Sequence, residues 1–131
     1  MATANTETIL VVDDEPAILD LVAGILKNNG YSVLPACGAE EALRVTGEHA
    51  NSLNLVLTDI VMPGLSGGEL VQRIMLLKPG IHVLYMSGYT KYTVVNHGIL
   101  ESVSSFIWKP FSPEELLQKV REVLDSPVET A

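Results

Sequence analysis

The sequence predicts a doubly wound α/β fold, in which a five-stranded parallel sheet is covered by helices on both faces as a (βα)5 sandwich. Short apolar runs of strand length alternate with stretches of helical periodicity, and this alternation repeats five times along the chain. The runs are nearly continuous in apolar residues, which is typical of parallel strands buried on both faces. A length of 131 residues with 47% hydrophobic residues suits one compact domain.

The predicted strands are short runs that stop abruptly at polar or turn-forming residues. They lie at 9–12, 31–36, 53–58, 82–86 and 105–108. The third run ends at the carboxylate of Asp59, and a Pro63-Gly64 turn follows it. We therefore expect Asp59 at the carboxyl end of a buried strand, where open α/β sheets place their ligands.

The first predicted helix begins near Pro16 and ends at Asn29 and Gly30. Asp14 or a neighbouring residue is expected to cap its first turn. Its expected buried stripe has apolar residues three and four positions apart, namely Ile18, Leu21, Val22, Ile25 and Leu26. Leu19 lies about 100° from Ile18 around the helix axis, so we expect it at the edge of this stripe and partly exposed.

Four further helices are predicted at 39–46, 70–78, 90–99 and from 113 to about 125. The third helix of the chain is preceded by a Ser-x-x-Glu capping box from Ser66 to Glu69. The same pattern, from Ser112 to Glu115, opens the last helix. The expected buried side of that helix consists of Leu116, Val120, Val123 and Leu124.

Composition and charge exclude several classes of partner. Sixteen acidic residues against eight basic ones give a net charge of −8, which disfavours contact with nucleic acid or with an anionic membrane. No apolar run approaches the roughly 20 residues that span a bilayer. The single cysteine, Cys37, excludes an internal disulfide and fits a reducing cytoplasm, where we expect the protein. Residues 1–7 and 126–131 are predicted to be flexible tails of a domain at 8–125.

The predicted strand ends carry side chains with matching chemistry. They are Asp13 and Asp14 after the first strand, Asp59 after the third, Ser87 after the fourth and Lys109 after the fifth. In a parallel sheet these ends emerge at the same edge. Three carboxylates there would raise one another's pKa unless a cation lies among them, and Mg²⁺ suits such oxygen ligands. With the charge of Lys109 and the hydroxyl of Ser87, the set predicts a cradle for a phosphoryl group.

Each of these residues alone also has an ordinary explanation. The acidic pair could cap a helix, Lys109 could be a surface charge, and Ser87 could belong to a turn. Asp59 could cap the turn that precedes Pro63. Their coincidence at successive strand ends favours a shared site.

Four motifs at these strand ends make the sequence resemble the receiver domains of response regulators, the CheY-like phosphoacceptor modules of two-component signalling. They are Val-Val-Asp-Asp-Glu at 11–15, Thr-Asp-Ile-Val-Met-Pro-Gly at 58–64, Met-Ser-Gly at 86–88 and Lys-Pro-Phe at 109–111. The resemblance extends from residue 8 to about residue 125 and implies a flavodoxin-like fold. The stretches 84–90 and 109–113 look most like receivers of hybrid sensor histidine kinases.

The resemblance implies a role for each residue of the site. Asp59 would receive a phosphoryl group from a histidine kinase or a histidine phosphotransfer domain. Asp14 would bind Mg²⁺ directly, together with Asp59 and the carbonyl of Val61, while Asp13 would bind it through water. Lys109 would pair with the phosphoryl group.

The resemblance also implies a conformational switch. Ser87 would move toward the phosphoryl group after transfer, and Phe106 would follow it inward. The peptide bond between Lys109 and Pro110 would be cis, which turns the lysine over the site. The kinase or phosphotransfer partner would dock over the first helix, with Leu19 as the candidate contact.

Two other functions are weighed against this one. Phosphohydrolases of the haloacid-dehalogenase type resemble the site but place a second aspartate two positions after the nucleophile, where this chain has Val61. Val61 also has no polar group to hold a water molecule, so we expect only slow self-dephosphorylation. A degenerate receiver that only binds a partner would lack Asp14, Asp59 or Lys109, and all three are present. The sequence leaves open whether the chain is a stand-alone regulator or a domain of a hybrid kinase.

Overall fold

The computed structural model describes residues 6–88 and 105–127 of the chain. Its elements are β1 (Thr8–Val12), α1 (Pro16–Asn28), β2 (Ser32–Ala36), α2 (Ala39–His49), β3 (Leu53–Asp59), α3 (Gly67–Leu77), β4 (His82–Ser87), β5 (Phe106–Trp108) and α5 (Pro113–Leu124). The five predicted strands are all present, and their ends differ from the predictions by one residue. The helix predicted at 90–99 lies outside the described residues. No helix of the described part is both long and apolar enough to cross a membrane.

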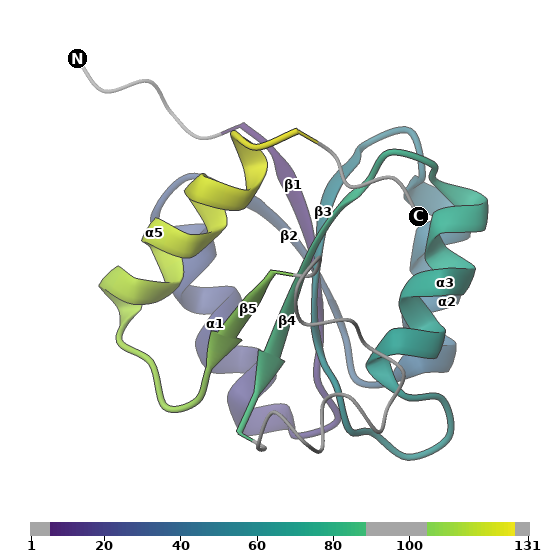
Figure 1. Ribbon diagram of the computed structural model, residues 1–131, viewed down its shortest axis with the longest axis horizontal. Helices are drawn as coiled ribbons and strands as arrows, with labels where there is room; N and C mark the ends of the chain where they lie inside the picture. Colours follow the sequence, from purple (N-terminus) through teal and green to yellow (C-terminus); the bar gives the residue numbers. More distant parts are fainter. Residues whose placement is uncertain (1–5, 89–104, 128–131) are drawn as a thin grey trace.

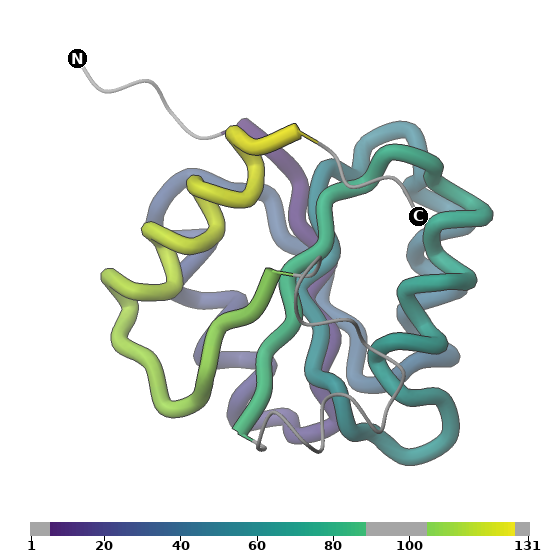
Figure 2. Tube along the Cα trace, viewed as in Figure 1, coloured from purple at the N-terminus to yellow at the C-terminus, as the bar shows by residue number. Residues whose placement is uncertain are grey.

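The strands form one parallel sheet in the order β2-β1-β3-β4-β5. Figure 1 shows α1 and α5 on one face of this sheet and α2 and α3 on the other. This is the predicted doubly wound arrangement, the CheY-like flavodoxin fold. Because all strands run in the same direction, their carboxyl ends share one edge, which is the lower edge in Figures 1 and 2.

Two apolar clusters, one on each face, hold the sandwich together. Alternate residues of a strand point to opposite faces, so Leu10 and Val12 pack toward α2 and α3, whereas Ile9 and Val11 pack toward α1 and α5. All four side chains are fully buried. The two faces therefore explain why the strands are apolar along their whole length.

The face of α1 that is buried differs from the prediction. Its buried residues are Leu19, Val22, Ala23 and Leu26. Leu21 is 61% exposed, although we expected it in the buried stripe, and Leu19 is only 7% exposed, although we expected it to be partly exposed. The difference arises because a second apolar stripe, which contains Leu19, shares Val22 and Leu26 with the predicted one, and this second stripe is the buried one.

The helix ends follow the predictions at α1, α3 and α5, and α1 begins at Pro16 and has Asn29 as its C-cap. Ser66 with Glu69 and Ser112 with Glu115 form complete capping boxes. The N-cap of α1 is Glu15, which makes no side-chain capping bond, so Asp14 does not cap this helix. Asp14 is left for the site at the sheet edge.

Candidate functional site

Three carboxylates meet at the carboxyl edge of the sheet. Asp13 and Asp14 follow β1, and Asp59 is the last residue of the adjacent strand β3. Val12 pairs with Thr58 in the sheet register, so the residues that follow them, Asp13 and Asp59, lie side by side. One carboxylate oxygen from each of the three aspartates lies within 4.8 Å of the others. The convergence predicted from the strand ends is therefore present.

Lys109, which follows β5, reaches this cluster from two strands away. Its Nζ lies 3.3 Å from Oδ2 of Asp13 and 3.6 Å from Oδ2 of Asp59. The Lys109-Pro110 peptide bond is cis, as expected. The backbone N–H of Lys109 donates a hydrogen bond to the carbonyl of Ser87 at 2.8 Å, which fixes the start of the lysine side chain against the end of β4.

The electrostatic balance of the cluster leaves excess negative charge. Burial raises the pKa of the Asp59 carboxyl above its usual range, and the charges of Asp13 and Asp14 raise it further. The Lys109 ammonium and the N–H of Ile60, 2.8 Å from Oδ1 of Asp59, lower that pKa without cancelling the effect. One cation among three carboxylates is not enough, so a further positive charge is favoured here.

The donor set fits a magnesium ion. Carboxylate oxygens are the hard ligands that Mg²⁺ takes from proteins, usually one or two of them with water in the remaining positions. Asp13 is fully buried and Asp59 is 5% exposed, whereas Asp14 lies closer to solvent. The cluster thus combines oxygen donors, excess negative charge and an approach from water.

The predicted switch residues, Ser87 and Phe106, lie on β4 and β5. Ser87 is fully buried and is the last residue of β4, one position beyond Met86, which pairs with Asp59. Phe106 is half-buried and stacks on Tyr85, with ring centroids 5.4 Å apart. The predicted switch residues therefore lie on β4, which is next to β3, and on β5, which is next to β4.

Sequence reasoning missed the exposure of Trp108. Its side chain is 39% exposed and stacks on Phe106, with ring centroids 5.4 Å apart and planes 7° from parallel. The available signal was strand alternation: Phe106 and Trp108 share one face of β5, with Ile107 on the other.

Gly67 is a second residue that sequence reasoning did not place at the site. Its N–H donates to the carbonyl of Ile60 at 2.7 Å. A Cβ at this position would overlap the carbonyl oxygen of Asp59 and would lie 2.9 Å from Cα of Ile60. The first turn of α3 thus packs directly on the backbone of the phosphoacceptor candidate, and only glycine permits that approach.

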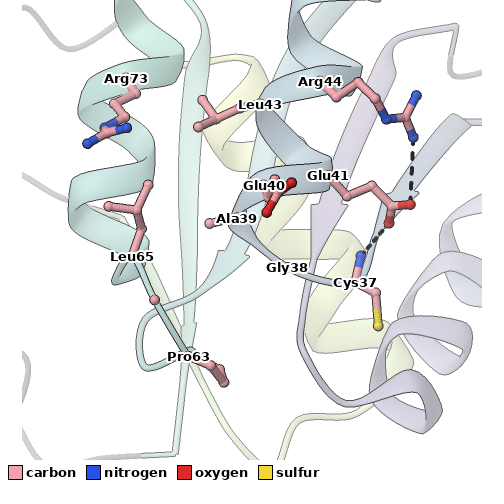
Figure 3. A pocket seen from close by; sticks show the side chains of 11 residues that line it. Cys37, Gly38, Ala39, Glu40, Glu41, Leu43, Arg44, Pro63, Leu65 and Arg73 are labelled. Atoms are coloured by element: carbon pink, nitrogen blue, oxygen red, sulfur yellow. Dashed lines mark hydrogen bonds and ion pairs between the residues drawn. The ribbon is translucent and has the colours of Figure 1, made fainter.

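A separate hollow of about 800 Å³ lies between α2 and the segment from Pro63 into α3 (Figure 3). Its residues are Cys37, Gly38, Ala39, Glu40, Glu41, Leu43, Arg44, Pro63, Gly64, Leu65 and Arg73. Figure 3 shows Glu41 between the backbone N–H of Cys37, at 2.7 Å, and Arg44. The hollow shares no residue with the acidic cluster.

Residues 9–121 match the family model of the response regulator receiver domain. The match covers most of the chain and agrees with the fold and with the acidic cluster at its edge. The chain belongs to the response-regulator receiver family.

Individual relatives agree with this assignment. The chain is 30% identical over 122 residues to the sensor kinase CckA of Brucella abortus, covering 93% of this chain and 13% of that protein. It is 37% identical over 108 residues to the two-component response regulator ARR14 of Arabidopsis thaliana, covering 82% of this chain and 28% of that protein. The structure of the chemotaxis protein CheY4 of Vibrio cholerae superposes with a TM-score of 0.80 at 26% identity, covering 91% and 99% of the two chains. The chain thus spans less than a third of either of these two curated relatives.

Proposed function

We propose that this receiver domain accepts a phosphoryl group on Asp59 from a phosphohistidine of a histidine kinase or a histidine phosphotransfer domain. The observation that carries the proposal is the asymmetric environment of the Asp59 carboxylate. Its Oδ1 accepts the N–H of Ile60 at 2.8 Å, while its Oδ2 lies 3.6 Å from Nζ of Lys109. One oxygen accepts a backbone hydrogen bond, and the other, which we propose as the nucleophile, faces the Lys109 ammonium.

The other buried carboxylate is less suited to be the acceptor. Asp13 uses Oδ1 to accept the N–H of Glu15 at 2.9 Å and Oδ2 to contact Lys109 at 3.3 Å. Asp13 is thus held closer to Lys109 than Asp59 is, and it is fully buried whereas Asp59 is 5% exposed. Asp13 is better placed to orient Lys109 and to add negative charge for a bound cation.

The transfer forms one bond and breaks one. Oδ2 of Asp59 attacks phosphorus, the phosphorus–nitrogen bond of the phosphohistidine breaks, and the electron pair leaves with the imidazole. Lys109 neutralises charge on the phosphoryl oxygens, so the protein contributes mainly positioning and electrostatics. Asp14, Asp59 and the Val61 carbonyl would hold Mg²⁺, with Asp13 acting through water. When bound, the ion supplies further positive charge to the phosphoryl oxygens.

The signal is a conformational change that begins at Ser87. We infer that the Ser87 hydroxyl moves to bind the phosphoryl group and that Phe106 follows it inward. Support comes from the position of Ser87 at the end of β4, next to β3, and from its carbonyl, which accepts the N–H of Lys109. The phosphoryl group then favours one of two surface arrangements.

Self-dephosphorylation is expected to be slow. Hydrolysis needs a water molecule held in line with the phosphorus, and Val61, half-buried two residues after Asp59, offers no hydrogen-bonding side chain. We expect a lifetime of minutes or longer, which corresponds to a barrier of about 21 kcal/mol or more. Replacing Val61 with Asn should shorten that lifetime.

The partner is proposed to dock over α1. Leu21 replaces Leu19 as the candidate contact, because its side chain is 61% exposed whereas that of Leu19 is buried. The relative named as a sensor kinase contains this domain as a small part of its length, which supports a hybrid kinase as one possible setting for the chain.

The direct test is incubation with acetyl phosphate and Mg²⁺, followed by intact mass measurement. We expect the mass of one added phosphoryl group on the wild-type protein and none on Asp59→Asn. Chelation of the metal should abolish the addition, and Asp20→Asn, at an exposed position of α1, should leave it unchanged. Undiminished labelling of Asp59→Asn would overturn the proposal.

A further inference from the structure

We propose that the chain self-associates through the face formed by α2 and α3, with a second copy related to the first by a two-fold axis. This α2–α3 face comprises the hollow of about 800 Å³ between the two helices together with Glu40, Leu43, Arg73, Leu76 and Leu77. It lies on the side of the sheet opposite α1 and α5 (Figure 1). The proposal does not depend on the identity of the phosphoacceptor.

Two leucines at the end of α3 are exposed to solvent. Leu76 is 83% exposed, more than any other large apolar side chain that the structure describes, and Leu77 is 48% exposed. They follow Arg73 by three and four positions, so they lie on the same side of α3, one turn further along. Single exposed apolar side chains are ordinary, but neighbouring ones are typical of surfaces that contact another protein.

The hollow on the same face offers an apolar surface to such side chains. Figure 3 shows Leu43 directed from α2 toward α3, and Ala39, Pro63 and Leu65 also line the hollow. Leu43 and Leu65 pack against the apolar cluster beneath the two helices, so the floor of the hollow is continuous with the core. A leucine that entered the hollow would exchange contact with water for apolar contacts, which is favourable.

The charges on this face are complementary to those of a second copy. Arg44 pairs with Glu41 and Glu48 within α2, and Figure 3 shows Arg44 and Glu41 on the side of α2 away from α3. Glu40 and Arg73 are exposed and make no ion pair with any residue that the structure describes. A strongly acidic or basic partner would match only one of these two charges, whereas a two-fold axis between them would bring Glu40 of each copy to Arg73 of the other.

The direction of the helices allows the apolar and the charged contacts to form together. α2 and α3 each follow a strand of the same parallel sheet, so they run in the same direction. A two-fold axis perpendicular to the face makes the helices of the second copy antiparallel to these. The end of α3 in one copy would then lie over the start of α2 in the other, where Ala39 lines the hollow. Leu76 and Leu77 of each copy would fill the hollow of the other while Glu40 meets Arg73.

The test is sedimentation equilibrium of the wild-type chain, with protein concentrations up to about 1 mM. We expect a monomer–dimer equilibrium. Glu40→Arg and Arg73→Glu should each weaken dimerisation at least about tenfold, because each change places like charges at both contacts. Mixed in equal amounts, the two variants should associate about as tightly as the wild type, since both contacts of the mixed dimer then join opposite charges.

Two further variants separate this face from other modes of association. Leu76→Ser should weaken dimerisation at least about tenfold, without lowering the stability of the monomer, because the side chain is 83% exposed. Glu114→Arg, at an exposed position of α5 on the other face of the sheet, makes the same change in net charge as Glu40→Arg and should alter the dissociation constant less than about twofold. A wild-type chain that stays monomeric throughout would overturn the proposal. So would a mixture that associates no more tightly than the single variants, full dimerisation of Leu76→Ser, or equal weakening by Glu114→Arg and Glu40→Arg.

Discussion

The two oxygens of the Asp59 carboxylate, the proposed nucleophile, have different partners. The backbone N–H of Ile60 holds Oδ1, and Lys109 stands near Oδ2. The same surroundings make the ionised carboxylate expensive to bury when no metal is bound. The ionised Asp59 carboxylate that the proposed reaction needs therefore lowers the stability of the metal-free protein.

Replacing Asp59 with Asn should stabilise the metal-free protein at neutral pH. The pKa of Asp59 is raised in the folded protein, so its contribution to stability is greatest below its ordinary pKa of about 3.8 and is lost as pH rises through the raised value. We expect Asp59→Asn to raise the free energy of unfolding by about 1 kcal/mol at pH 7. Urea unfolding should show this gain shrinking toward pH 4. A variant less stable than the wild type at pH 7 would contradict the account.

The rate of labelling by acetyl phosphate should depend on the ionisation of the Asp59 carboxyl. The neutral carboxyl is not a nucleophile, so the labelling rate should fall as pH decreases through the raised pKa of Asp59. The raised value places this fall at a higher pH than an exposed aspartate would show. Initial rates measured by intact mass across this range, at saturating Mg²⁺ and constant ionic strength, test the expectation. A rate that stays constant down to pH 4 would contradict it.

Replacing Gly67 with Ala should disturb the backbone of the site. The added Cβ would overlap the carbonyl oxygen of Asp59, and backbone cannot move aside as a flexible side chain can. We expect a loss of about 1–3 kcal/mol in unfolding free energy and slower labelling. Gly47→Ala in α2 is the matched control, because a Cβ there meets nothing within 4 Å. That change should stabilise the protein by about 0.5–1 kcal/mol. Equal effects of the two changes would refute the close approach.

At the scale of single elements, strand positions were predictable and the rotation of a helix was not. A parallel strand buried on both faces is marked by a continuous apolar run, so β1, β3 and β4 were found within one residue at each end. In α1, two apolar stripes overlap at Val22 and Leu26, and periodicity alone does not choose between them. Packing against the sheet buries the stripe that contains Leu19.

Alanine substitutions in α1 should show this rotation directly. Leu19→Ala removes a buried side chain and should reduce the free energy of unfolding by about 2–4 kcal/mol. Leu21→Ala removes a side chain that is 61% exposed and should change it by less than about 0.5 kcal/mol. Urea denaturation of the two variants makes the comparison. A larger loss of stability in Leu21→Ala than in Leu19→Ala would mean that the helix buries the face predicted from periodicity.

Across the whole molecule, the acidic cluster lies at the carboxyl ends of the strands. An ion pair between Glu7 and Arg121, which we call the clamp, lies at the opposite end of the sheet, before the start of β1. Parallel topology brought Asp13, Asp59 and Lys109 together, which is why the site could be predicted from strand ends. The clamp joins Glu7 to Arg121, 114 residues apart, with Nη2 2.6 Å and Nη1 3.3 Å from the two carboxylate oxygens. No sequence pattern links these two residues, because only the completed fold brings them together. Figure 2 shows the start of β1 beside the end of α5.

The clamp predicts a pH dependence of stability separate from that of the site. The hydrogen bonds from Arg121 lower the pKa of Glu7, so this contribution is present above the ordinary pKa of about 4.5 and is lost as pH falls through the lowered value. Glu7→Gln should reduce the free energy of unfolding by about 1 kcal/mol at pH 7. The difference from wild type should narrow toward pH 3 in urea unfolding. Labelling of Asp59 should be unaffected, and a loss of labelling would show that the clamp and the acidic cluster are coupled.

The central claim is that Asp59 is the residue that carries the phosphoryl group, and chemical mapping of the acyl phosphate tests it most directly. Borohydride reduces an aspartyl phosphate to homoserine and releases phosphate, so the site is marked in the sequence itself. After incubation with acetyl phosphate and Mg²⁺, reduction and proteolysis, peptide mass spectrometry should find homoserine at position 59 alone. Homoserine at position 13 or 14, or none at position 59 of a protein that has gained a phosphoryl group, would contradict the account.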